Sequence, residues 1–219
     1  IYNYEFINSS STEVETKILN KIILIHINRI RLDFTQKKLG DITSFDVLAY
    51  FLSNFIMNCI SDRDIKFFNQ FLVYQIDSLG MHRSYNILEH AKFINNLIEI
   101  RSIFLFFNFH ISEKLEEILL KMRSILNGYF HHDGTIPLFN GSNNNYTKAI
   151  YNSLNSDEYL KSRNFINTKN GIAFYSDKKM KLFLDVVQPN TDKISSNLSA
   201  GTLSFELSCL GEKIITNCG

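Results

Sequence analysis

The sequence contains no tryptophan and only three cysteines, and it carries almost no net charge. The absence of tryptophan weakens the case for a platform on which sugar rings stack, and most of the 19 phenylalanines are expected in the core. The 23 Lys and Arg residues nearly balance the 22 Asp and Glu residues, so no bulk field would hold a polyanion. We therefore expect no nucleic-acid partner, and any acidic ligand must meet a local basic site.

The three cysteines, Cys59, Cys209 and Cys218, do not have the spacing of a disulfide framework or of a metal cluster. A turn near residues 210–211 would place Cys218 opposite about Leu203. Cys218 would then lie well beyond the roughly 7 Å Cα separation that a bond to Cys209 allows. We expect reduced thiols, no metal and no cofactor.

Long apolar runs are also lacking. The stretch from Ile22 to Ile30 is interrupted by polar residues, and no run reaches the roughly 18 residues that would indicate a membrane span. The chain begins at Ile1 without a basic and apolar leader, and it ends at Gly219 within a regular pattern. We expect no membrane span, and we expect an internal piece of a longer protein.

What the sequence does contain is helical periodicity over its first two-thirds. Apolar residues at a spacing of three to four, with N-capping residues before them, predict one long helix over Thr12 to Arg31. The same signals predict further helices over residues 45–56, 61–76, 87–107, 112–128 and 146–154. Short connections between long helices indicate antiparallel neighbours.

Beyond about residue 162 the hydrophobic period changes from 3.6 to 2, which predicts antiparallel strands. Expected elements are a hairpin with an Asn-Gly turn over 165–175, a strand over 180–186, and a C-terminal hairpin over 203–208 and 213–217. In the strand at 203–208 apolar and polar residues alternate, so one face is apolar and the other polar. The turn of this hairpin is expected at Leu210-Gly211.

The fold class is therefore α then β. We expect helical hairpins over residues 1–162 and part of an antiparallel β-sandwich over residues 163–219.

Three stretches resemble the heparinase II/III-like family, polysaccharide lyases in which an α/α toroid precedes a β-sandwich. The C-terminal run Ala200–Gly219, AGTLSFELSCLGEKIITNCG, is similar to the family's entry into the sandwich. The loop YFHHDGTIPLFNGS at 129–142 resembles the family's aromatic, D-G and F-N-G loop, and Gly80–His90 is similar to G-x-H-x-x-x-x-P-x-Y-H. The resemblance extends over about residues 75–219.

The resemblance implies a lyase that cleaves an acidic, uronate-containing polysaccharide or oligosaccharide by β-elimination, in the periplasm or cell envelope. Such a reaction needs groups that neutralise the C5 carboxylate, remove the C5 proton and protonate the leaving O4. By the matched columns, the catalytic residues are His82, Glu89 and His90. We expect Arg83, Tyr85, His131 and His132 to bind the substrate.

The chain also departs from the family pattern. Ile87 replaces the proline, and Glu89 stands where the lyases carry a tyrosine acid/base. Asn197, Ser199 and Gly201 occupy columns that carry His, His and Asp in active members, so neither a metal nor their catalytic role carries over. The earlier Asn-His pair of the lyases also has no counterpart here.

Two alternatives to a lyase stay open. A catalytically degenerate family member would bind or organise envelope glycans without cleaving them. A glycosidase would need two cleft carboxylates roughly 5 to 10 Å apart, for which Glu89 and Asp133 are the candidate pair. The histidines also have structural interpretations, since His90 lies in an apolar helix and His131 and His132 flank a turn.

Overall fold

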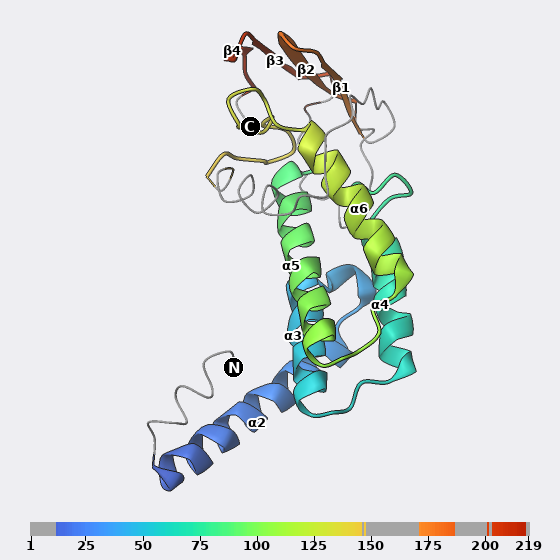
Figure 1. Ribbon diagram of the computed structural model, residues 1–219, viewed down its shortest axis with the longest axis vertical. Coiled ribbons are helices and arrows are strands. Elements are labelled where there is room, and N and C mark those ends of the chain that lie inside the picture. The colour runs from blue at the N-terminus through green and yellow to red at the C-terminus, as the bar shows by residue number, and fades with distance from the viewer. Residues whose placement is uncertain (1–11, 146, 148–170, 187–200, 202, 218–219) are drawn as a thin grey trace. The chain divides into compact units, whose positions relative to one another are not determined.

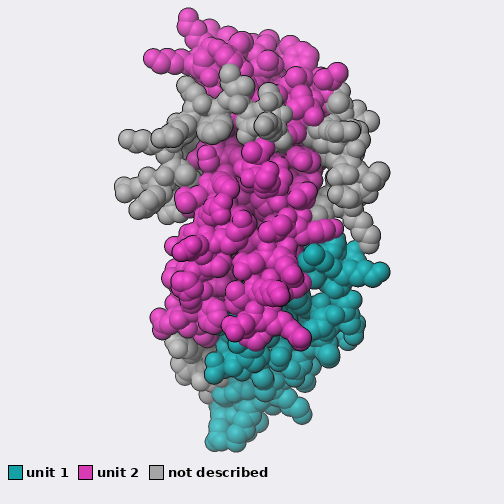
Figure 2. All heavy atoms as spheres, turned by 90° about the vertical axis from the view of Figure 1, so that its right-hand side faces the viewer, with its two compact units in different colours: residues 1–60 teal, residues 61–219 magenta. Residues whose placement is uncertain are grey.

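The computed structural model describes residues 12–145, 147, 171–186, 201 and 203–217. In this part of the chain, five α-helices are followed by a four-stranded antiparallel sheet, which confirms the predicted order of helices and then strands (Figure 1). The chain divides into two compact units, residues 1–60 and residues 61–219 (Figure 2).

Some sequence predictions fall outside these residues. They are the domain boundary at residues 162/163, the helix over 146–154 and the strand over 165–168. They remain predictions.

The first unit holds α2 (Glu13–Gln36), the 3-10 turn η1 (Leu39–Asp41) and α3 (Ser44–Ile56). A capping box begins α2, because the backbone N–H of Thr12 donates to Glu15 Oε2 at 2.7 Å and the Thr12 hydroxyl accepts from the Glu15 N–H. The predicted helix is thus confirmed.

The face of α2 that the structure buries was not predicted. The apolar stripe read from the sequence, represented by Ile18 and Ile25, is exposed, and Ile27 and Phe34 are the buried residues of the helix. At 3.6 residues per turn these two lie on the opposite side. The hydrophobic periodicity predicted the helix but did not predict which of its faces is buried.

The second unit contains α4 (Asp62–Gln75), α5 (Ile87–Phe106) and α6 (Glu113–Gly128). The capping box predicted at the start of α4 is present with an aspartate in the glutamate position. Asp64 accepts hydrogen bonds from the Ser61 N–H at 2.8 Å and from the Ser61 hydroxyl at 2.6 Å.

Helices α5 and α6 pack against each other in antiparallel directions, and α4 packs on α6 (Figure 1). The α5 helix is apolar on most sides and is the most buried of the three. Its buried apolar side chains are Ile87, Leu88, Ala91, Phe93, Ile94, Leu97, Ile100, Ile103 and Phe104. None of the described helices is both long and apolar enough to cross a membrane.

The sheet has the order β1-β2-β3-β4 and is antiparallel throughout. Its strands are β1 (Ile172–Ser176), β2 (Met180–Asp185), β3 (Phe205–Cys209) and β4 (Glu212–Ile215). The predicted turn between the last two strands is confirmed at Leu210-Gly211, where both residues have positive φ, 53° and 94°.

In β3 the alternation of apolar and polar residues is confirmed, but the polar face is the buried one. Glu206 is 0% exposed and Ser208 is 1% exposed, while Phe205 is 43% exposed. The buried polar face contacts the loop that follows α6. This strand is therefore held by a polar contact as well as by its backbone ladder.

Three aromatic rings join the sheet to the end of α6. The ring centroid of Tyr129 lies 5.6 Å from that of Phe174 and 6.2 Å from that of Phe183. Gly128 makes this approach possible, because a Cβ at that position would lie 2.9 Å from the Phe174 ring. The glycine at the end of α6 thus allows the sheet to pack closely.

We expect Phe183→Ala to lower the free energy of unfolding by about 3 to 5 kcal/mol, because Phe183 is 0% exposed and fills the middle of this ring cluster. Phe205→Ala in the neighbouring strand is the matched control, and its effect should be less than half as large. Urea unfolding followed by circular dichroism measures both. Equal losses in the two variants would contradict the packing described.

Candidate functional site

The loop that follows α6 is folded into a tight turn. The His131 N–H donates to the Thr135 carbonyl at 2.7 Å, and Asp133 Oδ1 accepts from the N–H and the hydroxyl of Thr135 at 2.9 and 2.7 Å. Gly134 lies between them at a φ of 79°, which favours glycine. The turn places His131 at its buried base and leaves His132 and Asp133 exposed.

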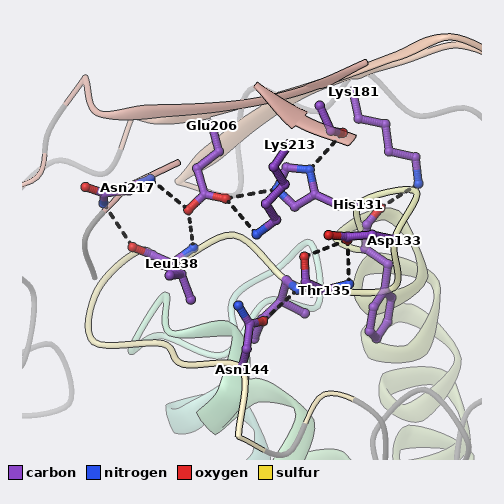
Figure 3. A network of polar contacts seen from close by, with 12 residues as sticks. His131, Asp133, Thr135, Leu138, Asn144, Lys181, Glu206, Lys213 and Asn217 are labelled. Carbon is purple, nitrogen blue, oxygen red and sulfur yellow. Dashed lines mark hydrogen bonds and ion pairs between the residues drawn. The ribbon is translucent and has the colours of Figure 1, made fainter. Parts of the chain in front are cut away.

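The His131 ring is enclosed between the loop and the sheet and is 2% exposed. Its Nε2 lies 2.9 Å from Glu206 Oε2, and its Nδ1 lies 2.9 Å from Ser208 Oγ (Figure 3). An ionised carboxylate only accepts hydrogen bonds, so Nε2 carries a proton. In the neutral ring, Nδ1 then accepts from the Ser208 hydroxyl. Both ring nitrogens of His131 are thus used inside the protein.

Glu206 is the centre of this network, with donors at both carboxylate oxygens (Figure 3). Oε1 accepts from the Leu138 N–H at 2.7 Å and from the Asn217 N–H at 3.2 Å, and Lys213 Nζ lies 3.4 Å from Oε2. Burial raises the pKa of Glu206, but the hydrogen bonds from His131 and Leu138 and the charge of Lys213 together hold that pKa below its usual value of 4.5.

The segment between α4 and α5 carries the other predicted site residues. Ile76 and His82 form an isolated antiparallel bridge around a turn. Asp77 Oδ1 closes the turn by accepting from the N–H groups of Leu79 and Met81 at 2.9 and 2.8 Å. This turn holds His82 just before the helix that contains His90.

His82 is 9% exposed and its ring packs against Phe93 at a centroid distance of 5.0 Å. Its Nδ1 lies 2.7 Å from Ser84 Oγ and also accepts from the Ser84 N–H at 3.3 Å. Because Nδ1 accepts from the Ser84 N–H, it carries no proton, and the Ser84 hydroxyl donates to it while its oxygen accepts from the Asn86 N–H. The neutral ring therefore carries its proton on Nε2.

Burial, and then the neighbouring His90, lower the pKa of His82 to about 3. His82 is consequently neutral at physiological pH, and its Nε2–H is a hydrogen-bond donor.

His90 is completely buried and joins three segments. Its Nδ1 accepts from the His82 N–H at 3.1 Å, and its Nε2 lies 2.9 Å from the Met122 carbonyl in α6, to which it donates. Burial lowers the pKa of His90 to about 4, although the bond to Met122 opposes the shift. With both nitrogens engaged, His90 holds α5 against α6 and supports His82.

The loop after α6 meets the start of α5 through a pair of asparagines. Asn86 Nδ2 donates to the Asn140 carbonyl at 2.7 Å, and Asn140 Nδ2 donates to the Tyr85 carbonyl at 3.3 Å. The Ser142 hydroxyl donates to Asn86 Oδ1 at 3.1 Å and accepts from the Ile87 N–H at 3.0 Å. The two segments that carry the predicted site are thereby joined.

Tyr85 and Asn140 both have positive φ, 51° and 54°. This region is readily adopted by asparagine but is strained for an aromatic residue. The Tyr85 backbone is held there by the Asn140 side chain and by its own N–H, which donates to the His82 carbonyl at 2.9 Å. Strain that is supported in this way is characteristic of functional sites.

Arg83, Tyr85 and Glu89 are the predicted residues at the surface here. Glu89 is exposed and pairs with Lys92 at 2.7 Å. The Arg83 Nε atom is buried and has no hydrogen-bond partner in the part of the chain that the structure describes. Burial and the charge of Asp77 raise the pKa of Tyr85. The phenol therefore remains protonated at neutral pH.

The seven residues predicted from the sequence thus fall into two groups. His82, His90 and His131 are buried, and Arg83, Tyr85, Glu89 and His132 are wholly or partly exposed. The first three of the exposed group lie around the start of α5, whereas His131 is directed to the sheet. The exposed residues can touch a ligand, and the buried ones can fix the position of the exposed ones.

Sequence reasoning did not identify Glu206, Asn86 or Asn140 as part of the site. Glu206 had a visible signal, because it stands on the polar side of an alternating strand. Asn86 and Asn140 had no such signal in the sequence beyond their positions, next to a helix start and next to a turn glycine.

Within the described residues, no three His, Cys, Asp or Glu side chains are grouped as a metal site requires. Cys59 and Cys209 are free thiols, and Cys218 lies outside those residues.

Comparison with known proteins supports the resemblance seen in the sequence. Residues 167–219 match the family described as heparinase II/III-like, C-terminal. The fold is similar to that of the heparan sulfate lyase HepC from Pedobacter heparinus, with a TM-score of 0.69 and 14% identity over 93% of this chain and 36% of that chain. The resemblance to the heparinase II/III-like family is thus confirmed.

Two further solved structures agree. A crystal structure of heparinase III has a TM-score of 0.59 and 15% identity over 80% of this chain and 34% of that chain. A heparinase III gene product with methylated lysines has a TM-score of 0.68 and 12% identity over 93% of this chain and 35% of that chain. The chain spans about a third of the length of these proteins, and at such identities the likeness concerns the fold. No curated protein matches the sequence.

We expect the free energy of unfolding to fall as the pH is lowered from about 6.5 to 4. In that window the unfolded chain binds protons on His82 and His90 before the folded protein does, so stability is lost on acidification. His90 alone should account for on the order of 2 to 3 kcal/mol. Urea unfolding at a series of pH values measures the slope.

His90→Gln should reduce that slope, since an amide can accept from the His82 N–H and donate to the Met122 carbonyl without titrating. His132→Gln, at the exposed turn, is the control and should keep the wild-type slope. A His90→Gln variant with an unchanged slope would contradict the assignment of a neutral, buried His90.

Proposed function

We propose that this protein acts on an acidic, uronate-containing polysaccharide by β-elimination, with Arg83, Tyr85 and Glu89 in contact with the sugar. The family match over residues 167–219 and a fold similar to that of a heparan sulfate lyase support the proposal. From the family resemblance we also propose the periplasm or cell envelope as its location.

The observation that carries the proposal is the environment of Arg83. Its Nε atom is buried, and no described residue accepts a hydrogen bond from it, next to a helix start whose own first N–H groups are already capped by Ser142 and Asn86. Arg83 as a whole is half-buried, so a ligand would meet the part of its side chain that solvent reaches. A sugar carboxylate suits this position because arginine binds carboxylates through two parallel hydrogen bonds.

The chemistry can be divided among the neighbouring groups. The Glu89 carboxylate removes the C5 proton, and the resulting electron pair forms the C4–C5 double bond as the C4–O4 bond breaks. The protonated Tyr85 phenol gives its proton to the leaving O4. Arg83 stabilises the negative charge that builds up on the uronate carboxylate.

The buried histidines act indirectly in this scheme. His90 fixes the backbone of His82 and joins α5 to α6, and His131 fixes the loop that bears the exposed His132. We assign the exposed His132 to contact with a neighbouring sugar unit.

A second candidate function is glycan binding without cleavage. It is favoured by the replacement of the family's tyrosine by Glu89 and by Asn197, Ser199 and Gly201 in the columns of missing catalytic residues. Loss of a positioned acid or base typically lowers a rate by about a hundred to ten thousand times. A site that binds and does not cleave would retain Arg83 as its main contact.

The two functions are separated by incubating the protein with heparan-type chains or alginate. A lyase raises the absorbance near about 230 nm, where an unsaturated uronate absorbs, and Glu89→Gln should lower that rate at least about a hundredfold. Binding without any rise in absorbance would favour the second function.

Arg83→Ala should weaken binding of an acidic oligosaccharide about tenfold or more in calorimetry, because it removes the cation that meets the carboxylate. Arg63→Ala, at the exposed start of α4, is the matched control and should bind as the wild type does. If the two arginine variants behave alike, the site is not at the start of α5.

A further inference from the structure

The buried carboxylate of Glu206 has no free position for a ligand. Leu138 and Asn217 donate to one oxygen at 2.7 and 3.2 Å, and His131 and Lys213 approach the other at 2.9 and 3.4 Å. Its side chain is 0% exposed. Glu206 therefore cannot touch a substrate, and its effect must pass through the groups that it holds.

Those groups belong to two different parts of the chain (Figure 3). His131 and Leu138 lie in the loop after α6, whereas Lys213 and Asn217 lie in and after β4. Asn217 closes the contact with a second bond, from its Nδ2 to the Leu138 carbonyl at 2.9 Å. The carboxylate thus fixes Leu138 by its N–H, while Asn217 fixes the same residue by its carbonyl.

A second set of hydrogen bonds joins the residues just after Leu138 to the start of α5. Asn140 Nδ2 donates to the Tyr85 carbonyl, and the Asn140 carbonyl accepts from Asn86 Nδ2. Ser142 Oγ accepts from the first N–H of α5. The hydrogen bonds of Glu206, the short chain segment from Leu138 to Ser142 and the bonds of that segment therefore connect the sheet to the backbone that presents Arg83, Tyr85 and Glu89.

The geometry points to Glu206 as a positioning residue of the acidic-glycan site, coupling the sheet to the start of α5. The site itself rests on the function proposed above. The arrangement requires a carboxylate, because four donors converge on its two oxygens. An amide in its place would offer one acceptor and two more donors, leaving the His131 and Lys213 protons without acceptors.

His131 contributes to the same positioning. Its Nδ1 is engaged by Ser208 on β3 and its backbone N–H by Thr135, so the ring can present only Nε2–H to Glu206. Ser208→Ala removes the bond to Nδ1 and leaves the carboxylate in place, which makes it a milder perturbation of the same network.

The test compares Glu206→Gln with Glu117→Gln, an exposed glutamate on α6 that pairs with Lys121 at 2.6 Å. Amide hydrogen exchange and calorimetric binding of a heparan-type oligosaccharide are measured on each folded variant. With Glu206→Gln we expect at least tenfold faster exchange over residues 85–90 and 138–142, unchanged exchange over α4, and affinity about tenfold weaker. Glu117→Gln should match the wild type in both measurements.

A double variant separates positioning from general destabilisation. Asn140→Gly removes the bond to the Tyr85 carbonyl while keeping a residue that tolerates positive φ, and it leaves the bonds of Asn86 and Ser142 in place. In this background, Glu206→Gln should still speed exchange at residues 138–142 but should add less at 85–90, and less to the loss of affinity, than it does in the wild type. Additive effects would overturn the proposed path.

Other outcomes are equally decisive. Faster exchange at 138–142 with no change at 85–90 would confine Glu206 to the loop and overturn the coupling, as would a uniform rise over the whole second unit. If Glu206→Gln does not fold, amide exchange over residues 85–90 and 138–142 is compared between Ser208→Ala and the wild type, and the same criteria decide whether the coupling exists. If the wild type binds no acidic glycan, the proposed function fails, and the exchange pattern still tells whether the coupling exists.

Discussion

The buried Glu206 carboxylate is the constraint on which the second unit depends. Moving a carboxylate out of water costs several kcal/mol unless hydrogen bonds and opposite charge replace the lost solvation. Here the replacements come from the loop, through His131 and Leu138, and from the sheet, through Lys213 and Asn217. These four donors surround the carboxylate only when the loop is docked on the sheet, so the charge is stable in that arrangement alone.

This constraint also distinguishes the surroundings of the three buried histidines. His82 and His90 are enclosed without a carboxylate, and each satisfies its neutral ring with bonds to backbone or hydroxyl groups, so burial lowers their pKa values to about 3 and 4. His131 instead faces Glu206. Residues of one type thus serve as neutral links in one segment and as the partner of a charge in another.

The helices and the last hairpin could be predicted because their signals are local. Ser61 and Asp64, for example, are three residues apart and define a helix start between them. The buried faces could not be predicted in the same way. Periodicity gives the two faces of a strand or helix but not which of them is covered, and the polar face of β3 is covered by His131, which is 75 residues away in sequence from Glu206.

The replacement of a tyrosine by Glu89 has a chemical consequence that follows from proton accounting. A single group can serve both proton transfers only if it hands to O4 the proton that it has just taken from C5. With two ionisable groups at this site, the proposed mechanism assigns removal of the C5 proton to Glu89 and donation to O4 to Tyr85. Tyr85 supplies a protonated phenol four residues before Glu89, on a backbone held at positive φ by Asn140. In the mechanism proposed above, cleavage depends on the geometry of that turn.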